Sequence, residues 1–252
     1  MAAEWSYYTA TFLAVILQGL SKGGFSGIGL LSMPLMALVL SPVRAAAILL
    51  PILIVQDWVG IWAFRRDANW RNLAILMPAS LIGIGLGWQF STRVSESQVR
   101  LAVGLISVGF VIYSLLRARL ADRATPVAKV APGLFWGALA GFTSFVSHAG
   151  APPFQVYVMP QKLNPKAYAG TAAVFFAAAN LLKVPPYFAL GQFSPENLWA
   201  SAALVPIAIA STFAGVWLVK RAPAERFYNI ILGLTFLVGL KLIFDAGRQM
   251  LG

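Results

Sequence analysis

Six apolar runs, each close to the roughly 20 residues that a helix needs to cross a bilayer, occupy most of this chain. Inside the hydrocarbon core every backbone N–H and C=O must be paired within the protein. The runs leave little sequence for a soluble domain. We therefore predict an all-α polytopic membrane protein that crosses the cell inner membrane several times. The predicted spans are residues 45–64, 72–90, 99–116, 167–190, 198–219 and 224–244.

Basic residues outnumber acidic ones by 19 to 8, which gives a formal net charge of +11. Most of them lie in short loops between predicted spans, and such loops stay in the cytoplasm. This distribution argues against nucleic-acid binding. Loop 191–197 has no Lys or Arg and loop 91–98 has only Arg93, so both are predicted to be outside. The predicted cytoplasmic loops contain Arg65, Arg66 and Arg71; Arg117, Arg119, Arg123 and Lys129; Lys162 and Lys166; and Lys220, Arg221 and Arg226.

Two glycine-rich segments, 21–29 and 141–151, interrupt apolar sequence at matching places in the two halves of the chain. A helix broken at membrane depth is tolerated only where protein or a water-filled cavity surrounds it. Paired breaks are the best sequence indication of a transporter's binding site. Because the loops on both sides are predicted to be cytoplasmic, segment 130–161 must enter the membrane and return.

Each half is therefore expected to consist of a re-entrant or broken-helix hairpin followed by three transmembrane helices. We predict a first membrane repeat at 1–116, a cytoplasmic linker at 117–129 and a second membrane repeat at 130–252. A hairpin plus three crossings reverses the direction of the second half. The repeats are thus predicted to be inverted, with their hairpin tips close together at mid-membrane.

The first break offers several hydrogen-bond donors to an anion: one lysine, two hydroxyls and the amides of three glycines. A lysine this deep needs a partner or a water-filled cavity. A half-helix starting near Ser26 would also aim its partly positive N-terminus at the break. Alternatively, the glycines only allow tight packing and the lysine extends to an interface. The predicted substrate-binding residues here are Ser21, Lys22, Gly23, Gly24, Ser26 and Gly27.

The second break contains the only histidine, His148, together with Ser144 and Ser147. A neutral histidine can donate a hydrogen bond to an anion, and a protonated one adds charge. The alternative is a buried polar residue paired with backbone. Two amides, Gln56 and Asn180, occupy equivalent positions on the first full span of each half. They are predicted either to flank the substrate or to hydrogen-bond helices together.

Asp57 is the one acid well inside a predicted span, and an intramembrane carboxylate is a functional hypothesis by default. We predict that it carries a coupling proton, with a structural charge pair as the alternative. Lys183 is a possible partner. Counting residues from the expected span ends, however, separates the two by roughly 10 Å in depth, which disfavours that pair.

Several short motifs accompany the two breaks. In the first half they comprise Gly23, Gly24, Gly27, Gly29, Pro34-Leu35 and the segment Ser41-Pro42-Val43-Arg44-Ala45-Ala46. In the second half they are Asn164-Pro165 and Ala169-Gly170-Thr171-Ala172. Together these motifs resemble the TauE/SafE family of anion exporters over nearly the whole chain. The resemblance implies a transporter of sulfite, of sulfonates such as sulfoacetate, or of other small organic anions.

The sequence thus predicts a secondary transporter, most simply an exporter, that works by alternating access with the anion bound between the two breaks. An anion channel is the main alternative. A membrane-embedded enzyme is disfavoured, because one histidine, no cysteine and one deep carboxylate provide neither a metal site nor a catalytic group. No cofactor is expected. Small residues on the spans favour a homodimer; they are Gly83, Gly85, Gly87, Gly104 and Gly109.

Overall fold

A computed structural model describes residues 2–25, 27–90, 93, 95–119 and 128–251. Within these residues the chain is helical and has no strand. The elements are α1 (Ala2–Lys22), η1 (Ile28–Leu31), α2 (Ser32–Ala37), α3 (Pro42–Phe64), α4 (Trp70–Phe90), α5 (Glu96–Arg119), α6 (Val130–Ser147), α7 (Ala151–Val158), η2 (Met159–Gln161), α8 (Pro165–Ala189), α9 (Pro195–Arg221) and α10 (Ala224–Leu251).

Seven helices of the described chain are long and apolar enough to cross a membrane. They are the six predicted spans and, in addition, α6, so the prediction of an all-α polytopic membrane protein is confirmed. Two of them begin with the same Ser-Pro signal. The hydroxyls of Ser41 and Ser194 accept hydrogen bonds from the backbone N–H groups of Arg44 and Asn197, each at 3.3 Å. Proline follows at the first helical position, where no N–H is needed.

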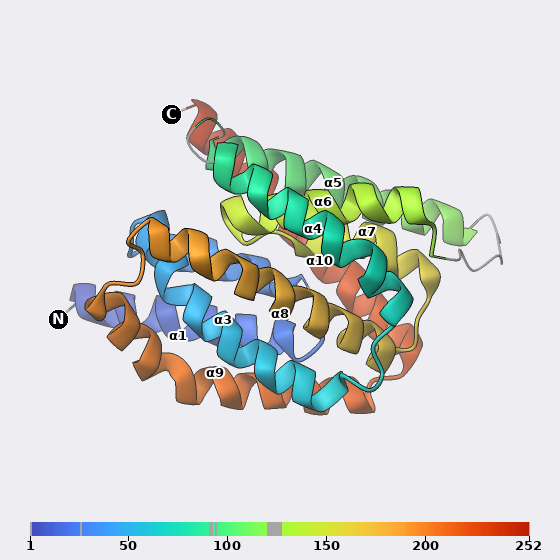
Figure 1. Cartoon of the computed structure of the whole chain (residues 1–252), viewed down its shortest axis with the longest axis horizontal. Coiled ribbons are helices and arrows are strands. Elements are labelled where there is room, and N and C mark those ends of the chain that lie inside the picture. Colours follow the sequence, from blue (N-terminus) through green and yellow to red (C-terminus); the bar gives the residue numbers. More distant parts are fainter. Residues whose placement is uncertain (1, 26, 91–92, 94, 120–127, 252) are drawn as a thin grey trace. The chain divides into compact units, whose positions relative to one another are not determined.

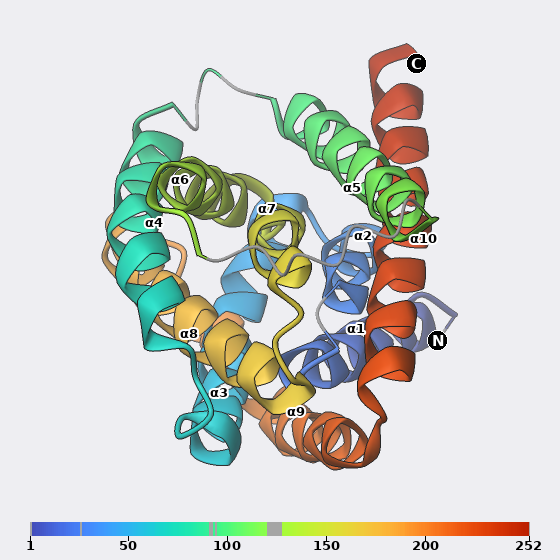
Figure 2. The ribbon, with the colours of Figure 1, turned by 90° about the vertical axis from the view of Figure 1, so that its right-hand side faces the viewer.

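The helices form two compact units. The first contains α1, η1, α2, α3, α8 and α9, and its long helices α1, α3, α8 and α9 lie beside one another in Figures 1 and 2. The second contains α4, α5, α6, α7, η2 and α10. Each unit takes helices from both halves of the sequence. The division into repeats 1–116 and 130–252 therefore describes chain order rather than packing, and it stays a prediction.

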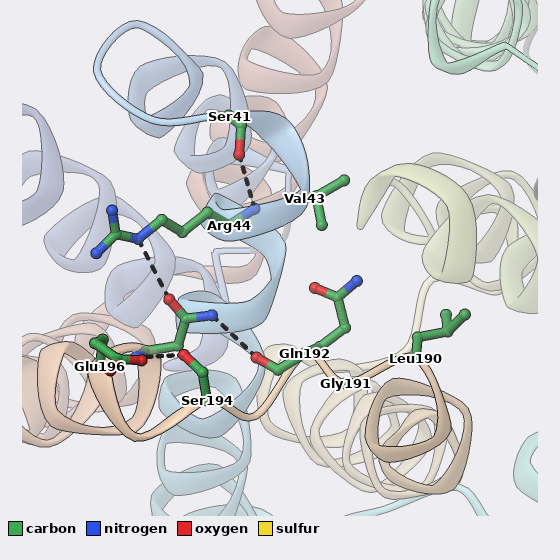
Figure 3. Close-up of a pocket in the computed structure, with 9 residues that line it drawn as sticks. Ser41, Val43, Arg44, Leu190, Gly191, Gln192, Ser194 and Glu196 are labelled. Atoms are coloured by element: carbon green, nitrogen blue, oxygen red, sulfur yellow. Dashed lines mark hydrogen bonds between the residues drawn. The ribbon is translucent and has the colours of Figure 1, made fainter.

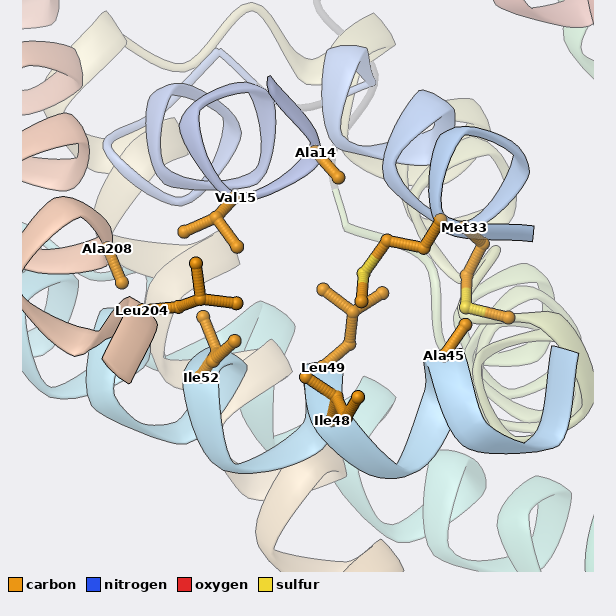
Figure 4. Packing of buried hydrophobic residues seen from close by; sticks show 10 residues of the cluster. Ala14, Val15, Met33, Ala45, Ile48, Leu49, Ile52, Leu204 and Ala208 are labelled. Carbon is orange, nitrogen blue, oxygen red and sulfur yellow. The ribbon is translucent and has the colours of Figure 1, made fainter. Parts of the chain in front are cut away.

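The first unit has an apolar core where α1, α2, α3 and α9 meet (Figure 4). Val15 of α1 and Leu49 of α3 are at most 1% exposed, and Leu204 of α9 is 6% exposed. Methionines from the short α2 fill the space beside them, as flexible thioether side chains do. The fully packed members of this core are Ala14, Val15, Met33, Met36, Ala45, Ile48, Leu49, Ile52, Leu204 and Ala208.

Glycines bring helix backbones together in the second unit. A Cβ on Gly141 of α6 would lie 2.2 Å from the Ser80 carbonyl oxygen of α4, and one on Gly83 would lie 1.9 Å from the Ala138 carbonyl oxygen. Gly104 likewise brings α5 close to α10, where an added Cβ would lie 2.8 Å from the Gly239 carbonyl oxygen. Three of the glycines expected at a dimer interface, Gly83, Gly87 and Gly104, therefore serve packing within the chain. The other two, Gly85 and Gly109, have no atom within 4 Å of an added Cβ, and the homodimer stays a prediction.

Candidate functional site

The first break begins where α1 ends at Lys22. The amide of Gly23 donates to the Gly19 carbonyl at 2.8 Å, and the amide of Gly24 donates to the Ser21 carbonyl at 3.1 Å. These two amides, predicted as donors to an anion, are instead used to close the helix. Gly24 and Gly27 have φ angles of 130° and 117°, which favour glycine. The Lys22 side chain is therefore the principal donor that this helix end presents.

Lys22 is paired with Asp57. Its Nζ lies 2.6 Å from Oδ1 of Asp57, and the two side chains are only 9% and 3% exposed. The other carboxylate oxygen, Oδ2, accepts a hydrogen bond from Nδ2 of Asn180 at 2.6 Å. Nζ also lies 5.1 Å from the centre of the Phe176 ring, within the range of a cation–π contact. The break thus ends in a buried ion pair between α1 and α3 that α8 supports.

Lys183 is the second buried lysine of this region and has no exposed surface. It follows Asn180 by three residues, about 4.5 Å along the helix axis. The depth difference of roughly 10 Å estimated from the sequence was therefore too large, because it was counted from span ends. The Asn180–Asp57 contact sets the true register of α8 against α3.

Gln56 lies beside Asp57 in the chain but has a different environment. Its Nε2 donates to the Val15 carbonyl of α1 at 3.2 Å, and its buried Oε1 has no hydrogen-bond partner. Of the two amides predicted as equivalents, Asn180 contacts the charged pair whereas Gln56 connects α3 to α1. This contact favours the helix-bonding alternative for Gln56.

The second break is shorter than predicted. Helix α6 continues through Gly141, Ser144 and Ser147, and the interruption covers only residues 148–150. Gly141 lies inside α6, where the absence of a side chain allows close contact with α4. His148 adopts the left-handed conformation, with φ of 51°, and its amide donates to the Ser144 carbonyl at 3.2 Å. Ser147 is buried and donates from Oγ to the Thr143 carbonyl.

The predicted site residues are thus distributed over both units. Lys22, Asp57 and Asn180 come together in the first, and Ser144, Ser147 and His148 belong to the second. Ser26 lies outside the described residues. Ser21 is partly buried at the end of α1, with its hydroxyl next to Gly29. In the described part of the chain, no three His, Asp or Glu side chains gather as a metal site would require.

A hollow of about 510 Å³ lies at the N-terminal ends of α3 and α9 (Figure 3). On α3 it is at the end away from Asp57. Arg44 extends into it, and its Nε donates to Oδ1 of Asn197 at 3.3 Å. The hollow is also lined by Leu190, Gly191, Gln192 and Ser194. Loop 191–197, predicted to be outside, lines this hollow.

The sequence matches the family described as sulfite exporter TauE/SafE over residues 11–242. The chain belongs to this family. The match includes the whole Lys22–Asp57–Asn180 cluster and both breaks. This TauE/SafE protein is therefore a membrane transporter by family, as the resemblance in its motifs implied. No curated protein and no solved structure gives a significant match to it.

The ion pair is the feature that sequence reasoning missed. Lys22 and Asp57 were each singled out, but as separate groups with separate roles. Their contact depends on how the hairpin returns against α3, where Gly60 admits the end of α1. A Cβ on Gly60 would lie 3.3 Å from the Lys22 carbonyl oxygen. A glycine one turn after a deep acid is a weak signal, but it was present in the sequence.

Proposed function

We propose that this TauE/SafE protein is a secondary transporter that exports a small anion, sulfite or a two-carbon sulfonate such as sulfoacetate, by alternating access. The observation that carries the proposal is the buried Lys22 at the end of a broken membrane helix, held by a single carboxylate. A family of sulfite exporters supplies the class of cargo.

The ion pair suits a site that must be emptied and refilled. A buried lysine without a counter-charge is costly, so Asp57 stabilises Lys22 when no substrate is bound. A sulfonate or sulfite oxygen presents the same kind of acceptor as a carboxylate. An incoming anion can therefore replace Asp57 at Nζ without leaving the ammonium unpaired. Asn180 remains available to hold the displaced carboxylate through Oδ2.

An anion channel is the alternative that the sequence left open. The closed ion pair favours a transporter, because the pair must open each time an anion binds at Nζ of Lys22. We also propose the cell inner membrane as the location and a homodimer as the assembly. The location rests on the family and on the apolar helices, and the homodimer rests on the small residues of the spans.

Calorimetric binding to the purified protein in detergent tests the proposal. The anions are sulfoacetate, sulfite, sulfate and acetate. We expect saturable binding of sulfoacetate or sulfite and at least tenfold weaker binding to Lys22→Met. Lys220→Met is the matched control, because Lys220 is exposed and lies over the Phe64 ring at the end of α3. Unchanged anion affinity in Lys22→Met would show that the anion binds at another site.

Loss of Lys22 alone leaves Asp57 buried without its partner and can unfold the protein. The double variant Lys22→Met/Asp57→Asn removes both charges and keeps the volume nearly constant. We expect it to fold and still to bind the anion at least tenfold more weakly. Normal binding by a folded double variant would contradict the proposed role of Lys22.

A further inference from the structure

Basic side chains gather where α3 and α9 end. The two helices start at one hollow and lie beside each other, so that their last turns are also neighbours (Figure 1). With 23 and 27 residues they are roughly 35 and 40 Å long, which exceeds the hydrocarbon core of about 30 Å. The residues that end them therefore reach the level of the lipid headgroups. The basic residues here are Arg65, Arg66, Lys220 and Arg221, and the acidic one is Asp67.

None of these four cations forms an ion pair with a carboxylate in the described part of the chain. Two of them contact a tryptophan of their own helix instead. The Arg221 guanidinium lies 4.3 Å from the centre of the Trp217 ring, a cation–π contact. Nη1 of Arg65 donates to the Trp62 carbonyl oxygen at 3.2 Å. Both guanidinium groups are thus held next to tryptophan residues, and the protein supplies no counter-ion for their charge.

Exposed aromatic rings continue the same surface toward the hydrocarbon core. The side chains of Trp62 and Trp217 are each more than half exposed, and Phe213 is 43% exposed. The ring centres of Trp62 and Phe213 are 5.9 Å apart, so the aromatic surface extends across both helices. Tryptophan is enriched at the membrane interface, where its ring sits at headgroup level. Apolar rings followed by cations match the order of acyl chain and phosphate in a phospholipid.

We propose that this arginine–tryptophan surface binds the phosphate of an anionic phospholipid such as phosphatidylglycerol. Its members are Trp62, Arg65, Arg66, Trp217 and Arg221. A guanidinium can donate two parallel hydrogen bonds to a phosphate, and the Trp217 ring supports the plane of those donors in Arg221. A lipid with net negative charge is preferred, because each basic residue near the membrane surface strengthens its binding about fivefold. The inference is independent of which anion the protein transports.

The helix that presents Arg221 to the lipid also holds the first break on its buried face. An added Cβ on Gly23 would lie 2.5 Å from Cα of Gly215, and one on Gly24 would lie 2.6 Å from Cγ2 of Val219. Val219 is buried and precedes Arg221 by two residues. A lipid that joins the ends of α3 and α9 should therefore stabilise the packing of the break. We expect phosphatidylglycerol to raise the melting temperature of the protein more than phosphatidylcholine does.

Titration of the purified full chain in detergent tests the proposal, with bound lipids counted by native mass spectrometry. The probes are phosphatidylglycerol and phosphatidylcholine with the same acyl chains, and glycerol phosphate as a soluble headgroup. We expect phosphatidylglycerol to bind at least tenfold more tightly than either of the others, and raised ionic strength to reduce this preference. Equal affinity for the two lipids would overturn the proposal. Glycerol phosphate that binds as tightly as phosphatidylglycerol would overturn the assignment to a lipid.

Variants locate the lipid on this surface. The triple variant Arg65→Gln/Arg66→Gln/Arg221→Gln removes three charges from exposed side chains and keeps their length nearly constant. It should bind phosphatidylglycerol at least tenfold more weakly and phosphatidylcholine as before. Arg44→Gln is the matched control, because Arg44 is an exposed arginine at the other end of α3. If the triple variant does not fold, Arg221→Gln alone should weaken phosphatidylglycerol binding about fivefold. Unchanged phosphatidylglycerol affinity in the folded variant would exclude this surface as the lipid site.

Discussion

Lys22 and Asp57 are interdependent side chains, and their stability effects should reveal it. Breaking a buried ion pair by removing one partner costs about 3–5 kcal/mol, whereas removing both is often nearly neutral. Both side chains here are less than a tenth exposed. We therefore expect Lys22→Met and Asp57→Asn each to lower the melting temperature in detergent strongly. The double variant should melt closer to the unmodified protein than either single variant. Additive losses would contradict a functional pair.

His148 presents a different situation, because its backbone has the left-handed conformation that glycine adopts most readily. Its φ of 51° lies in the left-handed region at the end of α6. A side chain in that region costs roughly 1–2 kcal/mol. His148→Gly should therefore keep or raise the melting temperature.

The same substitution separates the two interpretations of this histidine. If His148 binds substrate, as proposed from the sequence, His148→Gly should weaken anion binding although the protein is at least as stable. Asparagine tolerates the left-handed conformation, so His148→Asn serves as a second folded variant. Unchanged anion affinity in both variants would show that His148 does not bind the anion and only ends α6.

At the scale of helices, the contact between α4 and α6 depends on glycine. An added Cβ at Gly141 would lie 2.2 Å from the Ser80 carbonyl oxygen, so the two backbones must separate. We expect Gly141→Ala to destabilise the protein by about 1–3 kcal/mol, as overpacking does. Gly85→Ala on α4 is the matched control, because an added Cβ there has no atom within 4 Å. Thermal unfolding of the two variants in the same detergent gives the comparison, and equal melting temperatures would be inconsistent with the packing described.

The contrast between Gly141 and His148 explains how far the sequence could predict these helices. Span positions follow from apolar length alone, which is why six spans were found close to their observed bounds. The contact that a glycine allows between helices cannot be predicted from the neighbouring residues in the sequence. Gly141 was interpreted as part of a break, but it lies inside α6 and allows close contact with Ser80 of α4. The partner of Lys22 was missed for the same reason, since Asp57 is 35 residues away.

On the scale of the whole chain, the helix pairs correspond between the two repeats that we propose to be inverted. In the first unit α1 packs along α9, and in the second α6 packs along α4. Under the proposed repeat these are the same pair, and small residues meet in both, Gly23 with Gly215 and Gly141 with Ser80. The pairs α3 with α8 and α5 with α10 each join a helix to its own counterpart. In each unit, the first helix of one half packs against a helix of the other half. This pairing is expected if each half places its hairpin against helices of the other half.

Inversion makes a prediction about sidedness that cysteine labelling can test, since the chain has no cysteine of its own. Single cysteines at Gln192 and Ser95 should react in intact cells with a maleimide that cannot cross the membrane. A cysteine at Asp67, next to Arg65 and Arg66, should react only after the cells are opened. The unmodified chain is the labelling control. If Gln192→Cys and Asp67→Cys react from the same side, α3, α4, α8 and α9 cannot have the proposed directions. Because the inverted repeat requires those directions, that single result would rule it out.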